Sequence, residues 1–286
     1  MIFENKIKNN TKFIYLILIS FYSFFINFYY ADFGVFPIDT FLHYDAGYRI
    51  LKNEFPVKDF WIVTGFLVDF LQAFFFKVFG VSWISYKIHS SIFNLVISIF
   101  SFYFFLNLNF SNFKSLIYSI CFATLAYTIS GTPFVDLHAS FFLLLSTFVL
   151  ISAFKNPEKN YLWFFFILLI FLSFLSKQVP VVYALILQGP IIIYYMYLKK
   201  EKLNFRFIIS SIFLLPVTFF IILYFLKIDI SLFITEYIKY PREIGSGRIN
   251  IFNISSDSFF NKFKFIIIPI FVCILIETFS YIKKIK

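Results

Sequence analysis

Long apolar stretches alternate with short polar connections along most of the chain. A helix needs about 20 predominantly apolar residues to cross the hydrocarbon of a bilayer. On that rule the sequence predicts about eight membrane-spanning helices, at residues 12–31, 84–106, 114–130, 138–154, 161–176, 179–198, 206–227 and 263–282. The predicted fold is therefore an all-α integral membrane protein, organised as one polytopic domain over residues 1–286.

Two connections are much longer than the others, residues 32–83 and residues 228–262. Within the first of them, residues 61–79 are mostly apolar but carry Asp69, Gln72 and Lys77. A ninth span there would place the following basic connections on the opposite side of the membrane from the other basic connections. We therefore predict an interfacial helix that lies in the membrane plane.

Composition supports the membrane assignment. Hydrophobic residues make up 60% of the chain and charged residues 14%, against roughly 45–50% and 25% in soluble domains. The net charge of +10 invites a nucleic-acid partner, but the basic residues form no single stripe. We expect a lipid bilayer as partner and no nucleic acid. Cys121 and Cys273 lie in separate apolar runs, without the spacing of a disulfide framework or a metal site.

Charge asymmetry predicts the orientation. Basic residues of short connections favour the cytoplasmic side, and Lys6, Lys8 and Lys12 precede the first apolar run. That run is long enough to span and lacks a clear cleavage pattern, so we expect a retained signal anchor with a cytoplasmic N-terminus in the inner (plasma) membrane. Both long connections then face outwards, and they hold most of the acidic residues.

The first outer connection concentrates ionisable groups between Pro37 and Trp61. Proline is favoured at the first position of a helix, which places Asp39 in a first turn, with His43 four residues on and on the same side. Such a carboxylate can act as a general base toward an acceptor hydroxyl. It can equally be a helix cap in a solvated loop, and spacing alone leaves both interpretations open.

Lys177 follows a short span, next to prolines, with no acidic residue nearby in sequence. A lysine in this position either extends to the interface or holds an anion such as a phosphate. Arg242 and Arg248 in the second outer connection can add phosphate contacts through their planar donor forks. The alternative is a flexible loop with solvated charges.

A short connection near Thr132 leads into the fourth predicted span, where Asp136 and His138 lie close to the membrane surface. Imidazole and carboxylate groups together bind divalent metals. A metal site formed by Asp39, His43, Asp136 and His138 is therefore possible from residue types, and no other cofactor is indicated.

The segment from Asp39 to Asp59, directly after the first span, resembles the first outer loop of the GT-C superfamily of membrane glycosyltransferases. The resemblance is closest to the branch of protein O-mannosyltransferases and aminoarabinose transferases. It implies that Asp39 is the catalytic base, that Asp136 is a second acidic position, and that Ser176-Lys177 meets the lipid phosphate. Two departures are a threonine at position 40, where the family has glutamate, and the lack of a longer C-terminal part, so we expect a minimal member, a fragment or an enzyme with a partner.

The resemblance implies transfer of a sugar from a polyprenyl-phosphate donor to a hydroxyl of a glycan, lipid or protein at the extracytoplasmic face, with inversion. Asp136, His43, Asp45 and His138 would orient the acceptor or the sugar. One alternative is a lipid or solute transporter or flippase, which should carry more ionisable groups at membrane depth than the isolated Asn27 and Glu277. Another is a non-catalytic membrane subunit of an envelope glycan assembly system.

Overall fold

In the computed structural model, the regular secondary structure is helical across the part of the chain that is described. That part comprises residues 2–33, 35, 37–62, 64–127, 131–199 and 205–248, with 260, 261, 263, 264, 266–272, 274, 275 and 278. Within it there is no strand, only an isolated bridge between Pro56 and Phe60. The chain divides into two units, Met1–Ile238 and Lys239–Lys286.

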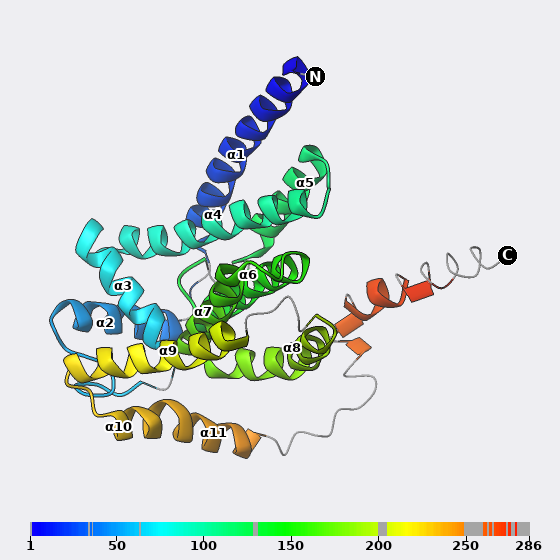
Figure 1. The fold of residues 1–286 in the computed structure, drawn as a ribbon. Helices are drawn as coiled ribbons and strands as arrows, with labels where there is room; N and C mark the ends of the chain where they lie inside the picture. The colour runs from blue at the N-terminus through cyan, green and yellow to red at the C-terminus, as the bar shows by residue number, and fades with distance from the viewer. Residues whose placement is uncertain are drawn as a thin grey trace. The chain divides into compact units, whose positions relative to one another are not determined.

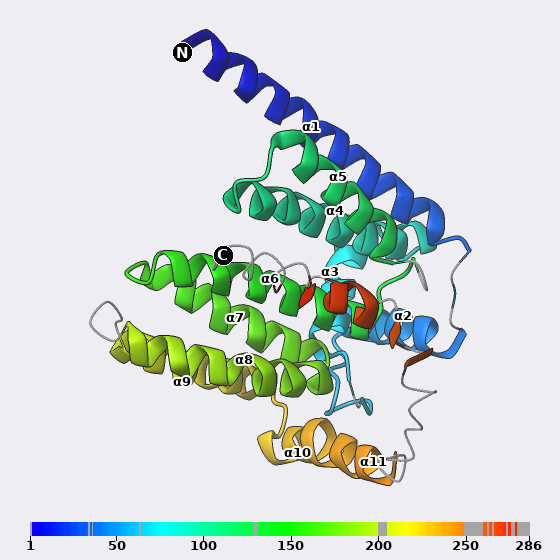
Figure 2. The ribbon, with the colours of Figure 1, turned by 90° about the vertical axis from the view of Figure 1, so that its right-hand side faces the viewer.

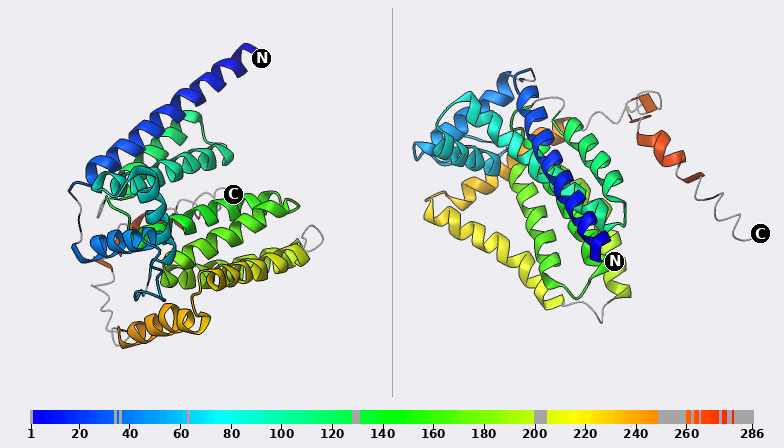
Figure 3. Two further views of the ribbon diagram at one scale, coloured as in Figure 1. Left: turned by 90° about the vertical axis from the view of Figure 1, so that its left-hand side faces the viewer. Right: turned by 90° about the horizontal axis from the view of Figure 1, so that it is seen from above.

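The first helices of the larger unit form one group, in which α1 (Ile2–Tyr30) packs along α4 (Trp83–Asn107) and α5 (Asn112–Leu125) (Figures 1 and 3). Burial of apolar side chains drives this packing. A cluster of Ile19, Phe102 and Leu116 takes one residue from each helix. Serine hydroxyls begin α4 and α5, because Ser82 and Ser111 each accept a bond from a first-turn backbone N–H.

A second group contains α6 (Val135–Lys155), α7 (Asn160–Ser176), α8 (Gln178–Leu198) and α9 (Phe205–Phe225), which run side by side (Figure 2). Trp163 and Phe166 of α7 are buried against α6, together with Ile208 of α9. Most of α8 is exposed although the helix is apolar. Such a surface is suited to lipid rather than to water.

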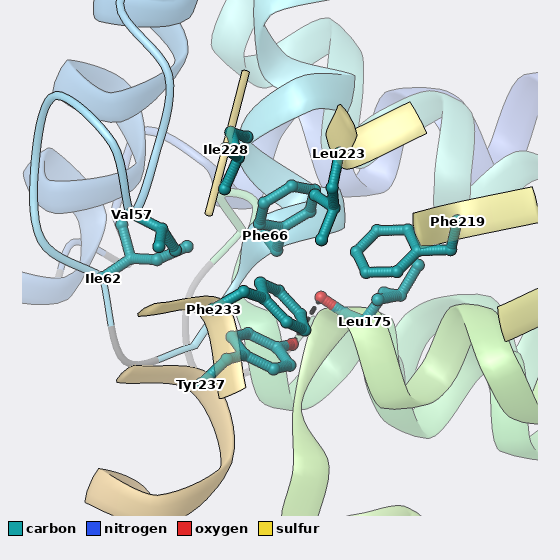
Figure 4. Packing of buried hydrophobic residues seen from close by; sticks show 9 residues of the cluster. All are labelled: Val57, Ile62, Phe66, Leu175, Phe219, Leu223, Ile228, Phe233 and Tyr237. Carbon is teal, nitrogen blue, oxygen red and sulfur yellow. Dashed lines mark hydrogen bonds between the residues drawn. The ribbon is translucent and has the colours of Figure 1, made fainter. Parts of the chain in front are cut away.

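Two shorter helices, α2 (Pro37–Leu51) and α3 (Phe66–Phe79), connect the groups, since α3 contacts α2, α4 and α7. After α9, α10 (Ile230–Ile234) and a π-helical turn, Thr235–Lys239, complete this part of the chain. A core rich in aromatic side chains lies between α3, α7, α9 and α10 (Figure 4). In it Phe66 packs edge-on against Phe219 and Phe233. The Tyr237 hydroxyl donates a hydrogen bond to the carbonyl of Leu175 at 2.7 Å. The second unit begins with α11 (Tyr240–Arg248).

Within the described residues, five helices are long and apolar enough to cross a membrane: residues 10–30, 83–107, 135–155, 178–198 and 205–225. The all-α membrane fold is thus supported at this coarser level, while the number eight stays a prediction. Two of the other expected spans are shorter, because α7 has 17 residues and α5 has 14. The span predicted at 263–282 lies partly outside the described residues. The helix predicted at 61–79 begins only at Phe66, after Gly65, whose φ of +92° suits glycine.

Candidate functional site

Gly65 lies where four elements meet. Its N–H donates to the carbonyl of Ser176 at the end of α7, at 2.9 Å. A Cβ placed on Gly65 would stand 2.6 Å from Cε1 of His43 on α2 and 2.8 Å from Cγ1 of Val135 on α6. The absence of a side chain therefore lets α2, α3, α6 and α7 converge, and we call this place the Gly65 junction.

On one side of the junction, His43 and Asp69 form a buried pair. Nδ1 of His43 lies 2.7 Å from Oδ1 of Asp69, and the side chains are only 2% and 1% exposed. Burial raises the pKa of the Asp69 carboxyl above its ordinary value, and the charge and hydrogen bond of His43 partly oppose that rise. Because a carboxylate oxygen accepts, a neutral His43 carries its proton on Nδ1 and presents the lone pair of Nε2.

A small cavity of about 170 Å³ borders this pair. Its volume is below the roughly 300–1,000 Å³ of pockets for drug-sized ligands, so it suits a small group such as one sugar ring. Its lining is rich in charged, polar and aromatic side chains. Those include His43, Asp45, Arg49, Trp61, Thr64 and Asp69.

Within the cavity lining, Arg49 already has partners. Its Nε donates to Glu54 at 2.6 Å, and its guanidinium lies over the ring of Phe60, 4.5 Å from the centroid. Asp45, by contrast, is exposed on α2. The cavity therefore presents carboxylate groups and an imidazole to a ligand. Arg49, the cation in its lining, is already paired with Glu54.

On the other side of the junction, Lys177 pairs with Asp136. Nζ of Lys177 lies 2.7 Å from the Asp136 carboxylate, and the two side chains are 26% and 42% exposed. Lys177 holds an extended backbone conformation between α7 and α8, and Asp136 lies in the first turn of α6. The structure thus brings together two predicted residues whose pairing the sequence did not reveal.

A second buried network runs behind the cavity, from α3 through α4 to α6. Nδ1 of His89 lies 2.8 Å from the Gln72 amide, Nε2 of His89 lies 3.2 Å from Nε2 of His138, and Nδ1 of His138 lies 3.0 Å from the carbonyl of Phe134. With the Gln72 oxygen facing His89, these three bonds need three protons, but two neutral rings carry only two. With the amide turned, its nitrogen donates to Nδ1 of His89. His89 then donates from Nε2 to His138, and His138 donates from Nδ1 to the carbonyl of Phe134, so all three bonds form while both rings are neutral. We therefore assign this network a structural role.

The candidates for a metal site are distributed over separate interactions. His43 bonds to Asp69, His138 to His89, and Asp136 to Lys177. Asp39 is exposed in the first turn of α2, as the proline signal predicted. Among the residues that the structure describes, no group of three or more His, Cys, Asp or Glu side chains could hold a metal ion.

The arginines proposed as phosphate contacts belong to the second unit. Arg242 is exposed on α11. Arg248 ends the same helix, and its side chain lies outside the described part, as does Glu277. Contacts of these arginines with a ligand at Lys177 stay a prediction.

The sequence did not single out Asp69, Gln72 or His89 as partners in these networks. One signal was available: Asp69 and Gln72 lie three residues apart in an otherwise apolar segment, and residues at that spacing share one face of a helix. Both are buried in α3. An amphipathic helix with only lipid and water as neighbours would instead expose its polar face.

No protein-family model, curated protein or solved structure matches this chain. The function must therefore be argued from the site.

Proposed function

We propose that this protein is a membrane glycosyltransferase that moves a sugar from a polyprenyl-phosphate donor to an acceptor hydroxyl at the extracytoplasmic face. The observation that carries the proposal is the Gly65 junction. It places a lysine and a sugar-sized cavity with carboxylate and imidazole groups beside the ends of apolar helices. A substrate with a polar head and an apolar tail fits such an arrangement.

In this mechanism the donor phosphate takes a place beside Lys177. The ammonium group stabilises the negative charge that develops on the phosphate as it leaves. The acceptor oxygen attacks the anomeric carbon from the opposite side, the bond from that carbon to the phosphate oxygen breaks, and the configuration inverts. A base on α2 takes the acceptor proton; the resemblance to the GT-C superfamily assigns this role to Asp39. Asp136 and Asp45 orient the sugar or the acceptor.

An apolar groove of about 330 Å³ between α3, α7 and α9 supports a lipid-linked donor. Its lining includes Phe66, next to Gly65, and Leu175, two residues before Lys177. Thr218 is the one hydroxyl among otherwise apolar lining residues. We propose that the groove holds the first isoprene units of the donor, because a tail leaving a phosphate at Lys177 reaches this surface first.

A transporter is the second candidate, and one observation favours it. The buried pair of His89 and His138 lies at the beginning of two spanning helices, where ionisable residues often mark a transport path. The neutral proton assignment above argues for packing instead. A transporter would move labelled lipid or solute between the two sides of a vesicle without forming a new glycosidic bond.

The test is transfer of labelled sugar in membranes. A panel of polyprenyl-phosphate sugars would be supplied to membranes carrying the wild-type chain, and label would be followed into envelope lipid, polysaccharide and protein. We expect transfer by the wild type, and its loss in Lys177→Met but not in Lys77→Met, a control at an exposed lysine of α3. Asp39→Asn tests the assigned base. Absence of transfer from every donor would overturn the proposal.

A further inference from the structure

We infer that His43, held in place by Asp69, is the base that takes the acceptor proton in this site. The inference rests on the proposed glycosyl transfer and names a different proton acceptor from the one that the family resemblance suggests.

The two candidate bases on α2 differ in their relation to the cavity. His43 and Asp69 both line it, whereas Asp39 is not among its lining residues. Asp39 is exposed in the first turn of the helix, one turn before His43. A general base must come within hydrogen-bond reach of the proton that it removes. A sugar ring or acceptor group in the cavity therefore lies next to His43 and not next to Asp39.

The hydrogen bond to Asp69 gives His43 the form that a base needs. Nδ1 donates to the carboxylate, so the lone pair lies on Nε2, and no bond from Nε2 to another residue is found in the described part of the chain. A buried carboxylate in this position fixes the ring orientation and the tautomer, and stabilises the imidazolium that forms on proton uptake. Asp69 is thus a positioning residue and His43 the catalytic one.

The proton and electron balance is complete without a further reactant. The acceptor O–H bond breaks and its proton goes to Nε2, while the acceptor oxygen forms a bond to the anomeric carbon. The bond between that carbon and the phosphate oxygen breaks, and its electron pair leaves with the polyprenyl phosphate. The imidazolium afterwards returns its proton to water in the cavity.

Several charged or titratable groups surround His43. Asp69 faces it from α3, while Asp45 and Arg49 line the same cavity from its own helix. His89 of α4 and His138 of α6 interact with it electrostatically. The charge of Asp69 in turn acts on Tyr86 and Tyr237. Apart from Arg49, which is paired with Glu54, none of these groups is a permanent cation.

The experiment compares purified variants in lipid nanodiscs with a donor that the wild type uses. Removal of a general base typically costs 10²–10⁴-fold in rate, so we expect His43→Gln to lower kcat at least about 100-fold, with KM for the donor little changed. Asp69→Asn should lower kcat by less and move the acid limb of the pH–rate profile to lower pH, because the imidazolium loses its counter-ion. An unchanged acid limb in Asp69→Asn would refute the positioning role.

Controls separate catalysis from folding. His89→Gln removes an equally buried histidine that does not line the cavity, and Asp32→Asn removes a carboxylate that is paired with Lys87 instead. Both should retain kcat within a few-fold when their folded fraction, measured by size-exclusion and thermal unfolding, is taken into account. His43→Asn, which is smaller than histidine, provides a second test if His43→Gln does not fold.

The outcomes distinguish the two proposals. Transfer by the wild type with equal kcat in His43→Gln and His89→Gln would overturn the role of His43 and leave the enzyme class intact. Loss of kcat in Asp39→Asn alone would do the same, in favour of Asp39. No transfer by the wild type from any donor would instead overturn the proposed function.

Discussion

A Cβ on Gly65 would stand 2.6 Å from Cε1 of His43, closer than side-chain carbons come in a folded protein. The φ of +92° at Gly65 is also strained for any other residue. We expect Gly65→Ala to destabilise the protein by about 1–3 kcal/mol and to lower sugar transfer by displacing His43. Thermal unfolding in detergent and the transfer assay measure the two effects.

Gly189 offers a matched control for this substitution. It lies inside α8, and a Cβ there meets nothing within 4 Å. Alanine in a helix interior is favoured over glycine by roughly 0.5–1 kcal/mol, so Gly189→Ala should leave the unfolding temperature equal or higher. Equal effects of the two substitutions would contradict the close packing at the Gly65 junction.

We expect Lys177 and Asp136 to affect binding of the donor more than the free energy of unfolding. Both side chains are partly exposed, and pairs of this kind are worth about 0–1 kcal/mol. Asp136→Asn should therefore change the unfolding free energy by less than about 1 kcal/mol. Lys177→Met should raise KM for the donor roughly tenfold or more, the usual cost of losing a hydrogen bond to a charged group. Equal KM values in Lys177→Met and Lys77→Met would refute the phosphate contact.

Asp32 should contribute a pH-dependent increment of stability. The hydrogen bond from Lys87 lowers the pKa of Asp32 below its ordinary value of 3.8. A carboxyl whose pKa is lower in the folded state adds stability above its ordinary pKa and loses it as the pH falls through the lowered value. The unfolding temperature of the wild type should thus exceed that of Asp32→Asn at pH 5–7. The difference should begin to shrink as the pH falls below about 3.8 and should disappear only once the pH is below the lowered pKa. A difference that is constant with pH would contradict this assignment.

Asn27 and Ser90 should behave as a coupled pair. The Asn27 amide donates to the carbonyl of Gly131 at 3.1 Å, and the Ser90 hydroxyl donates to the same oxygen at 2.7 Å. Either alanine substitution leaves this buried carbonyl with one donor, whereas the double variant leaves it with none. An unsatisfied buried group costs about 1–3 kcal/mol, and Asn27 also donates to the Ser90 hydroxyl at 3.0 Å, a bond that either single substitution already removes. The two stability losses should therefore not add, and strict additivity in a double-mutant cycle would contradict the coupling.

The sequence was most informative where a local rule determines the outcome. Proline at the first helical position placed Asp39 in the first turn of α2, and the turn between two apolar spans placed Lys177. Hydropathy identified the spanning helices of 21–25 residues. It was weaker for the 14 residues of α5, because a short apolar helix supported by neighbours resembles part of a span.

Contacts between distant segments explain most of what the sequence did not reveal. Asp69 lies 26 positions after His43, and Asp136 lies 41 before Lys177. No local rule joins residues so far apart, because such pairs depend on how whole helices pack. Asn27 appeared to be an isolated polar group at membrane depth, yet it bonds to Ser90, Ser91 and Gly131. Asn27 is thus explained by packing between helices.

The bond from Gly65 to the carbonyl of Ser176 has a consequence for biosynthesis. A ribosome delivers the N-terminal segments first, at roughly 5–20 residues per second. The segment that holds His43 and Asp69 therefore waits on the order of ten seconds before the end of α7 exists to cover it. During that interval a buried carboxylate-imidazole pair has no finished protein interior around it. We therefore expect α2 and α3 of the nascent chain to stay at the water-exposed surface of the bilayer until the later helices arrive.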